Sequence, residues 1–148
     1  MTIVKAHFKS TNLKNHSLKL GWFIISKHWV EQIRDQRNLY GKWCRIKDLE
    51  TEKIVYRIIS FSPMLKKNVD ENTNGIILDW AARVELSNFH GNEDRYYHLE
   101  ISRSNWLQAI KAAWIHPDPN QKLFFRIGVT LGAISTFLGI LSIILALN

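Results

Sequence analysis

An uncharged stretch of twenty-one residues, Ile127 to Leu147, limits most strongly what this chain of 148 residues can be. Most of its side chains are Ile, Leu, Val, Phe or Gly. A helix rises about 1.5 Å per residue, so about 20 residues cross the roughly 30 Å hydrocarbon core of a bilayer. The alternative, a core helix of a soluble protein, needs a large domain around it, and only about 120 residues precede it. We therefore predict a transmembrane helix.

Small residues recur along this predicted helix at steps of three and four, which keeps them on one face. Small side chains let membrane helices approach closely, and close approach drives their association. We predict that the helix self-associates and that the protein is a homo-oligomer, against the simpler interpretation of a mere anchor. The residues of this small-residue stripe are Gly128, Gly132, Ser135, Gly139, Ser142 and Ala146.

Charged residues flank only the amino end of the predicted span. Lys122 and Arg126 precede it, whereas Asn148 alone follows it. Positive residues remain on the cytoplasmic side of a membrane. We expect a single-pass protein of the cell membrane with a cytoplasmic amino-terminal domain, and a tail-anchored mode of insertion.

The residues before the span leave room for one soluble domain of about 100 residues. Six Trp residues and the hydrophobic content favour a packed fold over disorder. Cys44 is the single cysteine, so no internal disulfide can form, and the chain fits a reducing compartment.

Alternating apolar residues and β-branched runs predict six strands in this domain. We place the strands at residues 2–9, 20–25, 42–49, 54–62, 75–78 and 96–102, and helices at 27–37 and 80–84. The fold class expected is mainly β with short helices. Ser26 and Asp79 each end a strand at a position suited to an N-cap of the next helix.

Two halves of the domain follow the same plan of strand, polar cap, helix and strand. Gly21 to Ser26 leads into the first helix, as Gly75 to Asp79 leads into the second. This duplicated plan resembles the double-psi β-barrel. Within it, Ile76, Ile77, Asp79 and Arg83 resemble a run in the amino-terminal substrate-recognition domains of AAA unfoldases.

The resemblance covers residues 1–102 and implies a small six-stranded, double-psi-like barrel. It does not define a function, because one fold serves many functions. For Asp79 and Arg83 we expect structural roles, either pairing with each other or capping the turn.

A helix at residues 105–115 should follow the barrel, with Trp106, Leu107, Ile110 and Trp114 on one face. That face either packs on the barrel or lies in the membrane interface, where Trp is enriched. Two prolines stiffen the linker from His116 to Asn120. The domain layout expected is thus a cytosolic barrel at 1–102, an amphipathic helix with its linker at 103–122, and a transmembrane helix at 123–148.

Sequence motifs for catalysis are not evident. The six His residues show no metal-ligand spacing, and the four Gly residues of the soluble part are too dispersed for a phosphate loop. Cys44 lies in a strand pattern typical of a buried thiol. We predict no enzyme, no catalytic residues, no metal and no cofactor.

Positive charge is concentrated at the start of the chain. Residues 1–47 hold ten Lys or Arg and two acidic residues, whereas the remainder holds ten basic and eleven acidic residues. Such a region attracts anions: lipid headgroups, nucleic acid or a phosphorylated small ligand. The candidate ligand-binding residues are Lys14, Lys19, Arg45, Lys47, Lys66 and Lys67.

Two functions fit these features. In the first, the barrel senses an anionic, nucleotide-like ligand, and oligomerisation through the span acts on the membrane, as in small membrane effectors of prokaryotic antiviral defence. In the second, the protein is a membrane-anchored adaptor whose barrel recruits a protein partner. The small-residue stripe favours the first, because an adaptor needs only an anchor.

Overall fold

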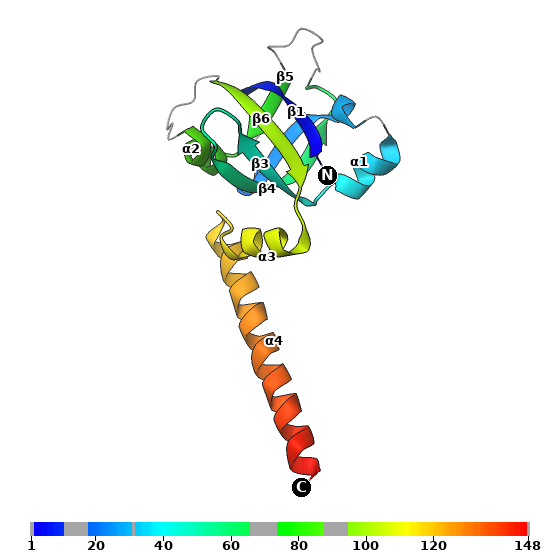
Figure 1. Cartoon of the computed structure of the whole chain (residues 1–148), viewed down its shortest axis with the longest axis vertical. Helices are drawn as coiled ribbons and strands as arrows, with labels where there is room; N and C mark the ends of the chain where they lie inside the picture. The colour runs from blue at the N-terminus through cyan, green and yellow to red at the C-terminus, as the bar shows by residue number, and fades with distance from the viewer. Residues whose placement is uncertain (1, 11–17, 31, 66–73, 88–94, 148) are drawn as a thin grey trace. The chain divides into compact units, whose positions relative to one another are not determined.

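The computed structural model describes residues 2–10, 18–30, 32–65, 74–87 and 95–147 (Figure 1). The chain forms two compact units, Met1–Ala112 and Ala113–Asn148. The first unit contains a closed barrel of six strands, which confirms a mainly β fold with short helices. The strands are β1 (Thr2–Ser10), β2 (Trp22–Ser26), β3 (Trp43–Asp48), β4 (Ile54–Ser62), β5 (Asn74–Leu78) and β6 (Arg95–Arg103).

The barrel closes in the order β1-β5-β2-β4-β3-β6, with β6 pairing back to β1. Two pairs are parallel, β1 with β5 and β2 with β4, and the others are antiparallel. Exchanging β1, β2 and β3 for β4, β5 and β6 leaves this set of neighbours and directions unchanged. The two halves of the chain are therefore interlocked copies of one plan, as the duplicated sequence pattern predicts.

One helix follows the second strand of each half, and Figure 1 shows the two on opposite sides of the barrel. These helices are α1 (Ile33–Leu39) and α2 (Trp80–Ser87). Ser26 accepts a hydrogen bond from the His28 amide at 3.3 Å, and Asp79 accepts one from the Ala82 amide at 2.9 Å. Asp79 thus caps α2 as predicted, whereas Ser26 caps only a 3₁₀ turn that precedes α1.

Alternation along the strands builds the barrel interior, since successive side chains point to opposite faces. On β3, Cys44, Ile46 and Asp48 are buried, while the residues between them are partly exposed. The fully buried core includes Phe8, Phe23, Ile25, Ile46, Ile59, Ile76, Leu86, Leu99 and Ile101.

The prediction of one continuous helix at residues 27–37 was wrong. A 3₁₀ turn, η1 (Lys27–Trp29), comes first, and Val30 and Gln32 have extended backbone before α1 begins. Ile33, the first residue of α1 after the extended Gln32, is 68% exposed. The predicted helix at 80–84 extends further than expected, to Ser87.

The helix after the barrel, α3 (Trp106–Trp114), lies where the amphipathic pattern predicts it. Its amino end is a capping box, in which the Asn105 side chain accepts from the Gln108 amide and the Gln108 side chain accepts from the Asn105 amide. Asn105 therefore caps the helix.

The second unit consists mainly of α4 (Pro119–Ala146), a helix of 28 residues with none buried. Asp118 caps it by accepting from the Asn120 amide at 2.9 Å, and Pro119 takes the first helical position, where no amide donor is needed. The helix thus begins inside the predicted linker.

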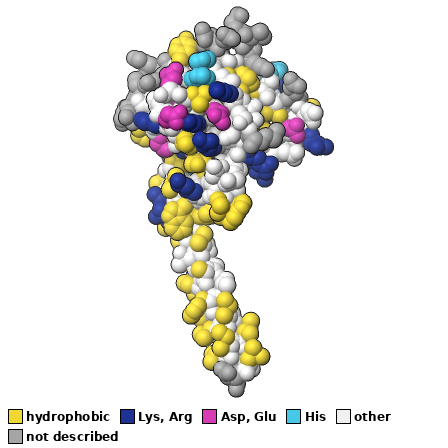
Figure 2. Space-filling view, in the orientation of Figure 1, with side chains coloured by type: hydrophobic (Ala, Val, Ile, Leu, Met, Phe, Trp, Pro, Cys, Tyr) yellow, Lys and Arg dark blue, Asp and Glu magenta, His cyan; other side chains and the backbone are white. Residues whose placement is uncertain are grey.

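By length and composition, α4 is able to cross a membrane, and within the described residues it is the one helix of this kind. Figure 2 shows its surface as hydrophobic and uncharged along most of its length. A C-terminal helix suited to anchoring in a membrane is therefore part of the fold.

Candidate functional site

One surface cavity on the barrel unit has a volume of about 600 Å³. It lies on the outer side of β2 and β4, and we call it the aromatic pocket. It is lined by Leu18, Lys19, Trp22, Ile24, Tyr40, Ser60, Phe61, Ser62, Pro63, Met64, Leu65 and Ile77.

Strand alternation and register assemble this pocket. Because Phe23 and Ile25 fill the barrel, Trp22 and Ile24 on the same strand point outward. The parallel register sets Ile24 beside Ser60 on β4. Tyr40, which follows α1, places its ring 6.1 Å from the Trp22 ring at an angle of 55°. Residues far apart in sequence therefore form one aromatic wall.

Lys19 is the only charged side chain that lines the aromatic pocket, among the residues the structure describes. The other polar groups include the hydroxyls of Ser60 and Ser62. Ligand sites commonly combine apolar and aromatic walls with a few polar groups that fix orientation. This arrangement suits a ligand with a flat or apolar body and one anionic group near Lys19.

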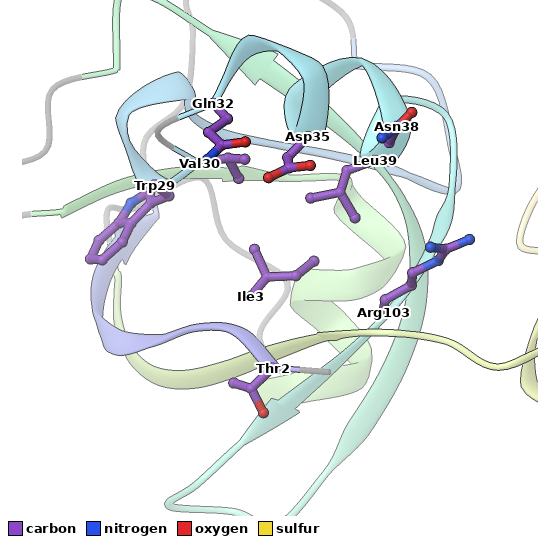
Figure 3. Close-up of a pocket in the computed structure, with 9 residues that line it drawn as sticks. All are labelled: Thr2, Ile3, Trp29, Val30, Gln32, Asp35, Asn38, Leu39 and Arg103. Carbon is purple, nitrogen blue, oxygen red and sulfur yellow. The ribbon is translucent and has the colours of Figure 1, made fainter.

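The second cavity, the α1 pocket, has a volume of about 390 Å³ and is shown in Figure 3. Asp35 and Leu39 point from α1 toward Ile3 of β1. Arg103, from the end of β6, also lines it. The charged residues that line the α1 pocket are Asp35 and Arg103, whose charges are opposite. The pocket therefore has no excess of positive charge that would attract an anion.

Of the six basic residues predicted to bind a ligand, the three that the structure describes do not line one common cavity. Lys19 lines the aromatic pocket, whereas Arg45 and Lys47 lie on the outer side of β3 and line neither cavity. Lys47 is paired with Glu52 at 2.7 Å. The remaining three, Lys14, Lys66 and Lys67, are outside the described residues.

The aromatic side chains of the pocket were not among the binding residues predicted from the sequence. The alternation in β2 contained the signal, since Phe23 and Ile25 inside the barrel require Trp22 outside it. The contribution of Tyr40 depends on the path of α1, which no local pattern predicts.

Asp79 pairs with Arg57 and not, as one expectation had it, with Arg83. Arg57 Nε donates to Asp79 Oδ1 at 2.9 Å, and the Gly21 amide donates to Oδ2 at 2.7 Å. Arg57 also donates to Glu85 at 2.8 Å. The expected capping role of Asp79 is correct. These contacts join β4, β5, α2 and the turn before β2, so we assign Asp79 a structural role.

Cys44 is fully buried on β3. Burial raises the pKa of its thiol from 9.0 to about 12, although the positive charge of Arg103 acts in the opposite direction. A cysteine nucleophile reacts as the thiolate, so this thiol is protonated and unreactive at neutral pH.

Two histidines come together on the barrel where β1 pairs with β6. His7 and His98 face each other in register, with stacked rings whose centroids are 4.1 Å apart. In the portions of the chain that the structure describes, no group of three or more His, Cys, Asp or Glu residues is placed to hold a metal ion.

These observations define a class of protein: a closed six-stranded barrel, with an aromatic pocket on its surface, joined to a helix suited to membrane anchoring. Comparisons with models of protein families, with curated proteins and with solved structures found no match.

Proposed function

We propose that this chain is a single-pass membrane protein whose cytoplasmic barrel binds an anionic, nucleotide-like ligand in the aromatic pocket. The observation that carries the proposal is the pairing of an aromatic wall, formed by Trp22 and Tyr40, with Lys19 beside it. Aromatic rings stack on a planar base, and a lysine ammonium attracts a phosphate. The basic residues Lys122 and Arg126 before the apolar span support the cytoplasmic placement.

The proposed barrel type is double-psi. The interlocked exchange of β1–β3 with β4–β6 and the two parallel pairs support this assignment, since they reproduce the duplicated plan. The proposal includes no catalytic step, because binding a ligand requires none. Burial raises the pKa of the Cys44 thiol to about 12, so this thiol is protonated at neutral pH.

The proposed action follows from self-association of α4 through the small-residue stripe, which perturbs the membrane when ligand binds. A Cβ atom added at Gly128, Gly132 or Gly139 meets no heavy atom within 4 Å outside the helix's own backbone. That face is open to a second helix, and small residues permit close approach. In this form the protein is an effector of the kind used in antiviral defence.

The test is ligand-dependent depolarisation of vesicles that contain the full chain. A panel of linear and cyclic nucleotides is added to wild-type protein, to Gly132→Ile and to Lys19→Gln. The proposal expects depolarisation with at least one nucleotide in the wild type and its loss in both variants. Absence of any response across the panel, with the protein folded and inserted, contradicts it.

A second candidate is the membrane-anchored adaptor, in which the same pocket receives an apolar segment of a protein partner. The observation in its favour is that eleven of the twelve lining residues are uncharged. A photo-reactive amino acid at position 40, in place of the exposed Tyr40, distinguishes the two. Cross-linking to one protein partner, without depolarisation by any nucleotide, favours the adaptor.

A further inference from the structure

An exposed apolar stripe runs along α3. At 3.6 residues per turn, its four large side chains fall within an arc of about 100°. Their exposed fractions range from 42% to 71%. We call this the α3 stripe, and its members are Trp106, Leu107, Ile110 and Trp114.

Ala112 lies on the opposite side of the same helix and is 1% exposed. The helix therefore turns a small residue toward the protein and its large apolar residues away from it. The sequence left two interpretations of this face, packing on the barrel or contact with the membrane interface. In the structure the stripe is exposed and does not pack on the barrel. An exposed apolar surface of this kind commonly marks an interaction site.

Contacts inside the second unit place the carboxyl end of α3 beside the start of the apolar span. The Trp114 ring meets the Phe125 ring edge to face, with centroids 6.3 Å apart. The guanidinium of Arg126 lies 5.1 Å above the Trp114 ring, and its Nη2 donates to the Trp114 carbonyl at 3.4 Å.

Arg126 is the last charged residue before the uncharged stretch. If α4 spans the bilayer, this arginine marks the boundary between headgroups and hydrocarbon, so Trp114 lies at that boundary too. Trp is enriched at this depth because its ring is apolar and its N–H is polar. The Trp114 end of the α3 stripe is thus in contact with the residues that immediately precede the apolar span.

We propose that α3 lies along the bilayer surface, with the α3 stripe buried in the headgroup region. The occupant is lipid, and the helix is a second membrane contact in addition to α4. Amphipathic helices with Trp and Leu on one face bind membranes in this way. Lys111, exposed on the same helix, favours anionic headgroups. This inference rests on the membrane anchoring in the proposed function.

The test uses the full chain in vesicles of phosphatidylcholine and phosphatidylserine, with or without lipids brominated near the headgroup. Bromine quenches tryptophan that enters the interface. We expect quenching in the wild type, a reduced quenched fraction in Trp106→Phe, and no reduction in Trp80→Phe. Trp80 is a matched control because it is 54% exposed but lies on α2 of the barrel.

A second variant tests the stripe without removing a tryptophan. Leu107→Lys is tolerated by the fold because Leu107 is 58% exposed, and it should lower the quenching of Trp106 by disfavouring insertion. Equal quenching in the wild type, Trp106→Phe and Leu107→Lys overturns the inference.

Carbonate extraction separates failure of this inference from failure of the proposed anchoring. Chains that resist extraction but show no loss of quenching in Trp106→Phe retain the anchor and refute the surface role of α3. Chains released by carbonate refute both. Protection of Trp106 from a water-soluble quencher without quenching by bromine identifies a protein occupant and also overturns the lipid assignment.

Discussion

Arg57 on β4 and Asp79 at the end of β5 form an ion pair inside the barrel unit, with Nε and Oδ1 2.9 Å apart. Their side chains are 3% and 0% exposed. Asp79 also accepts from the amides of Gly21 and Ala82. Gly21 has φ of +87°, a conformation that side-chain-bearing residues rarely adopt, so this turn presents its amide to Asp79 at low cost.

Replacing Arg57 by Met should destabilise the barrel strongly. The change leaves the Asp79 carboxylate buried without its cation, which typically costs about 3–5 kcal/mol. Denaturant unfolding of the detergent-solubilised chain, followed by tryptophan fluorescence, measures the loss. Glu52→Gln is the control, because its pair with Lys47 is on the surface and should change stability by less than about 1 kcal/mol. A similar loss of unfolding free energy in both variants would show that the buried pair of Arg57 and Asp79 stabilises the barrel no more than a surface pair does.

Alkylation of Cys44 should be slow in the folded protein and fast after unfolding. The thiol is fully buried, and burial raises its pKa to about 12, so almost no thiolate exists at neutral pH. A maleimide reagent and mass measurement with and without denaturant follow the reaction at the single cysteine. Rapid labelling under native conditions would contradict the burial of this residue.

Cys44 should also make stability depend on pH in the alkaline range. Its folded-state pKa, about 12, lies above the ordinary value of 9.0, so the unfolded chain releases this proton first. The stabilisation is fully present below about pH 9 and is lost as pH rises toward about 12. The unfolding free energy of Cys44→Ala, measured over the same range, should decline less steeply than that of the wild type.

Substitution within the small-residue stripe should disrupt oligomers without affecting the fold of one chain. Gly132→Ile and Gly139→Ile place bulk where the described part of a single chain has no neighbour within 4 Å. Chemical cross-linking in membranes should therefore show fewer oligomers in each variant. Ala133→Ile is the matched control, since Ala133 lies outside the stripe and receives the same side chain. An equal loss of cross-linked oligomers in Ala133→Ile would show that added side-chain bulk anywhere on the helix disrupts the oligomer, and would contradict a role for the small-residue stripe.

Lys19→Gln should weaken an anionic ligand of the aromatic pocket. A hydrogen bond to a charged group is worth about 1.5–3 kcal/mol, so affinity should fall roughly ten- to a hundredfold. Isothermal titration of the ligand that emerges from the nucleotide panel gives the comparison. Arg45→Gln, a change outside both described cavities, should leave the affinity within about twofold of the wild type if only diffuse charge is altered.

Elements governed by local pattern were predictable from the amino-acid order. The predicted strand at 54–62 coincides with β4, because β-branched and aromatic residues run through it until Pro63. The caps Ser26 and Asp79 were also predictable, because each accepts a hydrogen bond from an amide only two or three residues along the chain. The break between η1 and α1 was not, because residues 27–37 contain no Gly or Pro to mark it.

Of the candidate site, the sequence indicated Lys19 but not the aromatic wall around it. Tyr40 and Trp22 are eighteen positions apart and meet only after α1 has returned the chain to β2. Arg57 was likewise invisible as the partner of Asp79, twenty-two positions away. Both contacts depend on barrel closure, which brings together strands that are not successive in the chain.

By itself, the amino-acid sequence determined the apolar span, the strands and the helix caps, because hydropathy, alternation and capping act over a few neighbouring residues. The tertiary structure alone decided that Arg57 meets Asp79, that Trp22 and Tyr40 form one wall, and that α3 buries Ala112 and leaves the α3 stripe exposed. The physical reason is that these relationships depend on strand order and register in a closed barrel, and on which face of a helix meets the rest of the chain.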